Sequence, residues 1–185
     1  MLNHLPSIQK RSRRIPGRRW MTRASVTIII RRKNNSFDIL LIKRAERKGD
    51  PWSGDMAFPG GKMSQKDKSI YHTGLRELNE EIGLSDNKLR HVGRLSDLLT
   101  KTHSGFRPMI VSPFVFEMID QTEFTLNHEV AEVIWVPLVH FSTSVNRKNM
   151  IWKVKGLKVK VPCYWYKNRR VWGLTLRMID ELIAK

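Results

Sequence analysis

Apolar residues along this chain gather in short runs that predict β-strands. The runs of strand length are residues 24–31, 37–43, 56–58, 89–97, 109–118 and 130–136. The turn-like sequence Lys33–Ser36 separates the first two runs. Around Gly156, lysines alternate with apolar residues, which predicts a β-hairpin whose lysines face solvent and protect an exposed strand edge.

Helical spacing appears in two places. The first helix is predicted near residues 68–82, where Leu75, Leu78 and Ile82 recur on one face and belong to the core. Asp67 precedes this segment and is predicted to be the N-cap.

The second helix is predicted over residues 174–184, with Leu176, Ile179 and Ile183 facing inward. Strands interleaved with two helices that lie far apart in the sequence suggest an α/β fold. Its predicted form is an α/β/α sandwich around a mixed β-sheet.

The composition is that of an ordinary globular domain. A chain of 185 residues is long enough for one substantial core, and 41% of its residues are hydrophobic. The longest apolar runs are far shorter than a membrane span, so no membrane association is expected. Cys163 is the only cysteine and is predicted to be a buried small hydrophobe, which fits a reducing, cytoplasmic setting.

The net charge of +17 is concentrated in two segments without acidic residues. We expect residues 1–23 to form a short basic N-terminal arm, with a transit peptide as the alternative, and residues 24–185 to form the domain. The second segment is residues 133–179, whose lysines serve either to attract an anionic substrate or to protect a strand edge. A nucleotide with several phosphates suits this field, and nucleic acid is the alternative partner.

Three carboxylates on one helix face are the strongest chemical signal. Glu77, Glu80 and Glu81 are spaced i, i+3 and i+4, so neighbouring Cβ atoms lie about 5–6 Å apart. They repel one another at the negative end of the helix dipole, just before Gly83, the predicted C′ residue. A bound divalent cation would offset both penalties. The plain alternative is a surface helix in which Arg76 and Glu80 form an ordinary i,i+4 pair.

The segment from Gly61 to Leu84 resembles the Nudix box, the signature of hydrolases that cleave a nucleoside diphosphate linked to another group. From Arg76 onward it matches the pattern Arg-Glu-aliphatic-x-Glu-Glu-x-Gly-aliphatic at every specified position. The first half departs twice: the spacing is one residue longer than usual, and Asp67 stands where the family has glutamate. The resemblance implies the Nudix-type sandwich and a requirement for Mg²⁺, with Mn²⁺ as the alternative ion.

The longer box loop and the sequence Gly-Asp-Met-Ala-Phe-Pro-Gly-Gly at residues 54–61 resemble the coenzyme A diphosphatase branch of that family. The upstream signature of this branch is met only in part, because Gly49 stands at its second arginine position. His103 is a candidate for contacting phosphate, and Trp52 for stacking on an adenine ring. The residues that we expect against the substrate are Arg44, Arg47, Lys48 and Gly61.

The resemblance also implies a set of metal ligands. The carboxylates of Glu77, Glu80 and Glu81 map onto the metal-binding carboxylates of the family, and the carbonyl of Gly60 maps onto its backbone ligand. Their hard oxygens suit Mg²⁺.

Arg76 maps onto the family arginine that orients the glutamates, with Asp67 as its partner. Because aspartate is one methylene shorter than glutamate, we expect a looser brace. The first choice for the general base is a metal-held water near Glu77 or Glu80, so the expected catalytic set is these two residues and Arg76. The alternative candidates for the base are Glu129 and Glu132.

The expected reaction is Mg²⁺-dependent cleavage of the diphosphate bond of coenzyme A or its thioesters, giving adenosine 3′,5′-bisphosphate and 4′-phosphopantetheine. One alternative is a related enzyme that acts on damaged nucleotides or RNA 5′ ends. The other is a basic nucleic-acid-binding protein with an inert Nudix domain, and the complete glutamate set argues against it. The sequence leaves the oligomeric state open.

Overall fold

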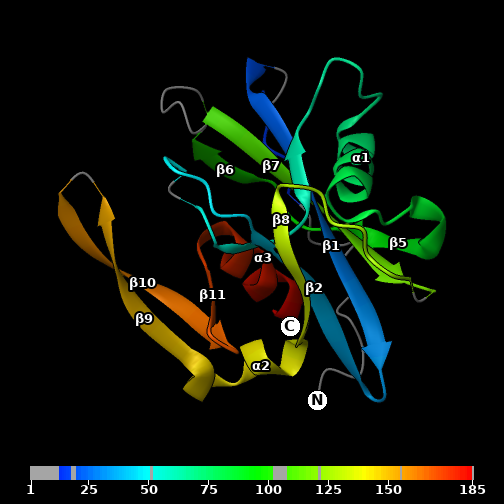
Figure 1. Cartoon of the computed structure of the whole chain (residues 1–185). Helices are drawn as coiled ribbons and strands as arrows, with labels where there is room; N and C mark the ends of the chain where they lie inside the picture. The colour runs from blue at the N-terminus through cyan, green and yellow to red at the C-terminus, as the bar shows by residue number, and fades with distance from the viewer. Residues whose placement is uncertain are drawn as a thin grey trace.

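A computed structural model of the chain describes residues 13–17, 20–50, 52–101, 108–120, 122–154 and 156–184. These residues form a large mixed sheet, a smaller three-stranded sheet and helices on both sides of the large sheet (Figure 1). His103, residues 1–12 of the predicted arm and its Arg18 and Arg19 lie outside the described residues.

The large sheet is built around its first strand. Its members are β1 (Thr22–Lys33), β2 (Ser36–Arg44), β3 (Met56–Ala57), β4 (Gly60–Lys62), β5 (Leu89–Arg94), β6 (Leu98–Lys101), β7 (Pro108–Met118) and β8 (Val130–Pro137). Strand β1 is parallel to β7 and antiparallel to β2 and β4. Strands β3 and β8 extend the sheet from β2, and β5 and β6 extend it from β7, all antiparallel. The predicted mixed sheet is confirmed.

The central strands are buried on both faces, which is why their sequences are continuous apolar runs. In β1, Ile28 and Ile30 pack on one side of the sheet and Ile29 on the other; in β2, Leu41 and Leu40 divide in the same way. The helices are α1 (Ile70–Ile82), α2 (Leu138–Ser142) and α3 (Gly173–Ile183), with short 3₁₀ turns at Asp86–Lys88 and Ser144–Asn146. Helix α1 packs on the Ile29 side and α3 on the Ile28 side, so the α/β/α sandwich is confirmed.

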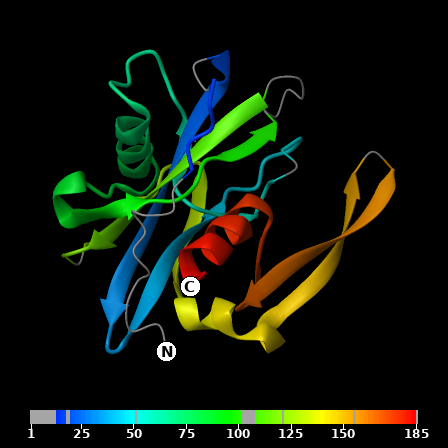
Figure 2. The same ribbon diagram turned by 180° about the vertical axis from the view of Figure 1, so that it is seen from behind.

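The predicted hairpin around Gly156 is also confirmed. It is formed by β9 (Arg147–Val154) and β10 (Leu157–Tyr166), and β11 (Arg169–Trp172) completes the smaller sheet. The hairpin extends away from the large sheet in both views (Figures 1 and 2). The alternation alone would suggest that the apolar side of the hairpin is covered. Instead it is open to solvent, since Leu157 is 70% and Val159 43% exposed. Cys163, near its base, is buried as predicted.

Several local predictions need correction. Helix α1 begins at Ile70, and Ser69 is its N-cap in place of Asp67: the Ser69 side chain accepts a hydrogen bond from the His72 N–H. The predicted strand over residues 89–97 ends at Arg94, and neither β6 nor α2 was predicted. None of the helices formed by the described residues has the length and apolar character needed to cross a bilayer.

Candidate active site

Helix α1 is held at both ends, which fixes the direction of its glutamate face. Ser69 caps the first turn, and Gly83 ends the helix in the left-handed conformation with φ of 70°. The Gly83 N–H donates to the Asn79 carbonyl oxygen at 2.9 Å. Leu78 and Ile82 are buried against the sheet, so the opposite side of the helix presents Glu77 and Glu80.

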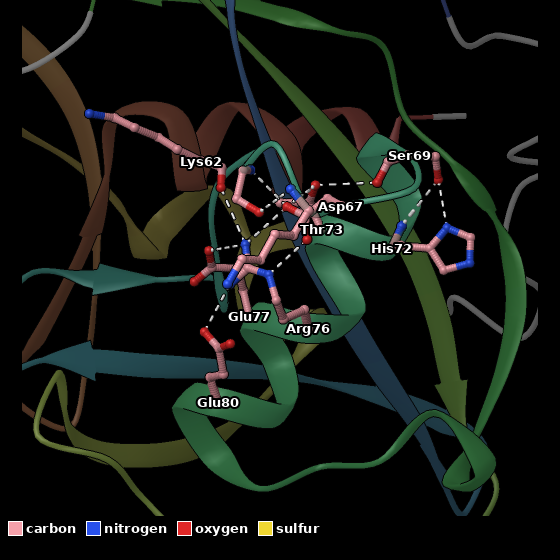
Figure 3. A network of polar contacts seen from close by, with 10 residues as sticks. Lys62, Asp67, Ser69, His72, Thr73, Arg76, Glu77 and Glu80 are labelled. Carbon is pink, nitrogen blue, oxygen red and sulfur yellow. Dashed lines mark hydrogen bonds and ion pairs between the residues drawn. The ribbon is translucent and has the colours of Figure 1, made fainter.

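Arg76 is the centre of a network of ion pairs (Figure 3). Its guanidinium donates to both oxygens of Asp67, at 2.8 and 3.1 Å. It also donates to Glu77 and Glu80, each at 2.8 Å, and to the Lys62 carbonyl oxygen at 3.3 Å. The ordinary i,i+4 pair of Arg76 with Glu80 is therefore present, but within a network that also holds Glu77. The Asp67 carboxylate in turn raises the pKa of Arg76.

Asp67 braces this network more firmly than its short side chain led us to expect. Its carboxylate also accepts hydrogen bonds from the Ser64 N–H at 2.8 Å and from the Thr73 hydroxyl at 3.0 Å. The hydrogen bonds from Arg76 hold the pKa of Asp67 far below its usual range. The expectation of a looser brace is wrong, because the loop before the helix brings this aspartate against the arginine.

Glu81 lies in a different environment. It is only 5% exposed, and among the described residues its carboxylate accepts one hydrogen bond, from the Gly60 N–H at 2.9 Å. Within the described part of the chain it forms no ion pair. Burial raises its pKa to about 8, with smaller contributions from the charges of Glu77 and Glu129. Burial also raises the pKa of Glu77, although Arg76 opposes the shift.

Two glycines allow β4 to lie between β1 and α1. A Cβ at Gly60, where φ is 151°, would lie 2.2 Å from the Ser25 carbonyl oxygen. A Cβ at Gly61 would lie 2.5 Å from the carboxyl carbon of Glu77. Gly60 therefore requires glycine, whereas a side chain at position 61 would displace the Glu77 carboxylate. The close approach of the strand places the Gly60 amide on Glu81.

The donor groups at this site fit a hard divalent cation. No three carboxylate, histidine or cysteine side chains among the described residues form a ready-made metal cluster. The reason is visible in the contacts: Arg76 holds Glu77 and Glu80, and Gly60 holds Glu81. Carboxylate oxygens are nevertheless the ligands that Mg²⁺ prefers. The buried carboxyl group of Glu81, which forms no ion pair with a described residue, is the kind of group whose ionised form a bound cation would stabilise.

A pocket of about 570 Å³ lies beside β3 and β4, and Arg44 and Lys62 line it together with three tryptophans. Arg44 donates to Asp50 at 2.6 Å, while its buried Nε finds no acceptor among the described residues. The tryptophans come from a loop, from β9 and from β11: they are Trp52, Trp152 and Trp172. The pocket thus joins cationic groups near the glutamate face to an aromatic wall.

Two residues predicted to lie against the substrate, Arg47 and Lys48, do not line this pocket. Arg47 forms an ion pair with Glu129 at 3.4 Å, and Glu129 acts electrostatically on Glu77 and Glu81. Lys48 is exposed and does not belong to the pocket lining.

Glu132, the other predicted base, is paired with Arg169, whose Nε donates to it at 2.7 Å. That ion pair lines a separate pocket, which makes Glu132 the weaker candidate for the base.

Sequence reasoning missed Lys62, Trp152 and Trp172. In the sequence, Trp152 is one apolar position of the alternating hairpin pattern, and Trp172 belongs to the segment 171–175, which resembles the coenzyme A diphosphatase branch without any stated role for the tryptophan. Their rings lie 4.3 Å apart between centroids because β10 joins β9 to β11. No local pattern in the sequence predicts that these two rings lie together.

Comparison with known proteins gives consistent matches. The sequence model of the NUDIX domain family matches residues 21–153. A protein of Photorhabdus laumondii subsp. laumondii, named uncharacterized Nudix hydrolase NudL, is 32% identical over 144 residues, covering 77% of this chain and 74% of that protein. The Ap4A hydrolase of C. elegans in a binary complex superposes with a TM-score of 0.55 at 17% identity, over 64% of this chain and 82% of that one. The NUDIX domain of Shewanella oneidensis NrtR, solved with ADP ribose, superposes with a TM-score of 0.50 at 18% identity, over 64% and 74% of the two chains.

Proposed function

The chain belongs to the Nudix hydrolase family, whose members act on pyrophosphate bonds, and from this premise we propose that it cleaves the diphosphate of coenzyme A or its thioesters. The products would be adenosine 3′,5′-bisphosphate and 4′-phosphopantetheine. Nudix hydrolases generally use divalent metal ions, and the ion proposed here is Mg²⁺, with Mn²⁺ as the alternative.

The observation that carries the proposal is the buried Glu81 carboxylate next to Gly60. A carboxylate with a pKa of about 8 that sits beside other acids is costly for folding and typical of a functional site. Glu77 lies one turn earlier on the same helix, Glu80 is the preceding residue, and the Gly60 backbone approaches closely. These four residues would hold the cation, through three carboxylates and the Gly60 carbonyl.

When bound, Mg²⁺ would neutralise charge on the diphosphate, lower the pKa of a water molecule and orient the leaving group. The residues of the chain have separate tasks. Arg76 positions Glu77 and Glu80 by direct ion pairs. Glu77, whose pKa is raised by burial, is the leading candidate to take a proton from the attacking water, and Glu129 is the alternative.

Substrate phosphates would lie against Arg44 and Lys62 in the tryptophan-lined pocket. The Arg44 side chain is 40% exposed, so its guanidinium can donate to an anionic oxygen of the substrate. Gly61 would let the diphosphate approach the β4 backbone, while Arg47 acts at longer range through Glu129. The exposed Lys48 adds to the surrounding positive field.

A small nucleoside diphosphate derivative fits this arrangement, and a structural neighbour was solved with one, ADP ribose. Nucleic acid remains the alternative because the net charge is +17. Side-by-side kinetics with Mg²⁺ on coenzyme A, ADP-ribose, 8-oxo-dGTP and triphosphorylated RNA would decide. We expect the highest kcat/KM with coenzyme A or an acyl thioester; a higher value with any of the other three would refute the proposed specificity.

A further inference from the structure

The β9–β10 hairpin has two chemically different faces. In an antiparallel pair, directly opposed residues point to the same side. Trp152 is opposed to Val159, and Met150 to Val161, so these side chains share one face. The opposite face carries Lys153 paired with Lys158, and Ile151 paired with Lys160. The hairpin is therefore amphipathic. We call the side that bears Trp152, Val159, Leu157, Met150 and Val161 the apolar face.

The apolar face is the one turned to the pocket beside the glutamates. Trp152 lines that pocket and contacts Trp172, with ring centroids 4.3 Å apart. Val159 lies directly across from Trp152, and Leu157 lies two residues further toward the tip on the same side. An apolar surface thus runs without interruption from the wall of the pocket out along the hairpin.

This surface is unusually exposed for its composition. Leu157 is 70% and Val159 43% exposed, although both would favour burial. Its outer part is aliphatic, and apart from the indole of Trp152 it offers no side-chain hydrogen-bonding group to a nucleobase or a peptide. Its chemistry fits an aliphatic chain, and its continuity with the pocket fits a chain attached to the bound substrate.

We propose that the apolar face of the hairpin binds the acyl chain of a coenzyme A thioester. The inference rests on the proposed function and deepens it, because it makes the thioester, rather than free coenzyme A, the preferred substrate. The diphosphate lies against Arg44 and Lys62 beside the glutamate face, the pantetheine segment continues along the tryptophans of the same pocket, and the acyl chain extends past Trp152 along Val159 and Leu157. Residues 154–172, which include most of this surface, lie outside the part of the chain that the family model matches.

The test compares coenzyme A with octanoyl-coenzyme A in two matched variants. Val159→Thr combined with Leu157→Thr makes the apolar face polar. Ile151→Thr makes the same kind of change on the lysine face, where Ile151 is 60% exposed. Threonine favours strands, so both variants keep the hairpin. We expect the double variant to raise KM for octanoyl-coenzyme A about tenfold and to leave KM for coenzyme A within about twofold, while Ile151→Thr changes neither.

Direct binding separates this inference from the proposed reaction. Tryptophan fluorescence, with Trp152 beside the proposed chain, gives Kd for both ligands without turnover. Tighter binding of the octanoyl thioester that the double variant abolishes supports the inference, even if neither ligand is hydrolysed and the proposed function fails. Equal losses for both ligands, no loss for either, or a change in the sedimentation of the protein in the double variant would overturn it. The last result would assign the apolar face to a contact between two copies of the chain.

Discussion

The two ends of helix α1 treat a buried carboxylate in opposite ways. Before its first turn, Asp67, with a side chain 5% exposed, accepts hydrogen bonds from Arg76, from Thr73 and from the Ser64 amide. In its last turn, Glu81 is buried as a whole residue, its carboxylate accepts one hydrogen bond from the Gly60 amide, and it forms no ion pair among the described residues. Asp67 as a whole residue is only half-buried, so the two ends differ both in depth and in how the charge is compensated.

We propose that this difference separates a carboxylate with a structural role from one that binds a ligand. The pKa of Asp67 is held far below its usual range by Arg76, whereas burial raises the pKa of Glu81 to about 8. A buried charge with partners can contribute stability, and one without them is costly. We interpret the last turn of α1, where Glu81 has no ion pair among the described residues, as the place where a bound cation supplies the positive charge.

The largest expected effect comes from Glu81→Gln, which keeps the shape of the side chain and removes its charge. If Glu81 holds the cation, Mg²⁺-dependent turnover of the preferred substrate should fall by at least about 100-fold. Glu117→Gln is the control, because Glu117 is also largely buried but pairs with Arg90 on β5. Near-normal turnover in Glu81→Gln would show that this carboxylate is not a ligand.

The second effect is on stability in the absence of metal. The folded protein holds a proton on Glu81 up to about pH 8, whereas the unfolded chain releases it near the ordinary value of 4.5. Stability should therefore fall as pH rises from about 5 to 8, by up to roughly 1.4 kcal/mol per pH unit. Urea unfolding in EDTA at several pH values measures this slope. The slope should be markedly flatter in Glu81→Gln, and equal slopes in the two proteins would contradict the uncompensated burial of Glu81.

The third effect concerns the compensated end. Asp67→Asn removes charge-assisted hydrogen bonds from Arg76 and should lower the free energy of unfolding by about 1.5–3 kcal/mol at neutral pH. The stability that Asp67 supplies is present above its unfolded pKa of about 3.8 and is lost only as pH falls through its much lower folded pKa. Denaturant unfolding at pH 7 and pH 3 tests both statements, because the loss should be full at pH 7 and only partly reduced at pH 3; a loss that has vanished already at pH 3 would contradict the strongly lowered pKa.

The smallest expected effect is that of Asp180→Asn, which serves as a reference for the loss of stability in Asp67→Asn. Asp180 forms two hydrogen bonds with Arg147, at 2.8 and 2.9 Å, but its side chain is 35% exposed. An exposed pair of this kind contributes about 0–1 kcal/mol, so Asp180→Asn should be the milder substitution. If it destabilises as much as Asp67→Asn, the burial of Asp67 has no special importance.

The sequence was most informative where structure follows from local spacing. The continuous apolar runs of β1 and β2 predicted strands, and Gly83 marked the end of α1. The start of α1 was misplaced because both Asp67 and Ser69 are good N-caps. The choice between them depends on Arg76, nine residues beyond Asp67, because the aspartate carboxylate pairs with this arginine and does not cap the helix.

The part of the candidate site that lies on helix α1 was predictable from the sequence. The spacing of Glu77, Glu80 and Glu81 is visible in the sequence, but which of them is buried without a cation is not, because the Gly60 strand decides it. The meeting of Trp152 with Trp172 depends on the order of strands in the smaller sheet and was equally out of reach.

The most direct test of the central claim is the melting temperature at pH 8 with and without Mg²⁺, in the parent protein and in Glu81→Gln. A cation that binds only the folded state at 100 times its Kd should add about 2.7 kcal/mol. We predict that Mg²⁺ raises the melting temperature of the parent protein and has little effect on Glu81→Gln. No rise in the parent protein at saturating Mg²⁺, or the same rise in both proteins, would contradict the claim that the Glu81 carboxylate binds a metal ion.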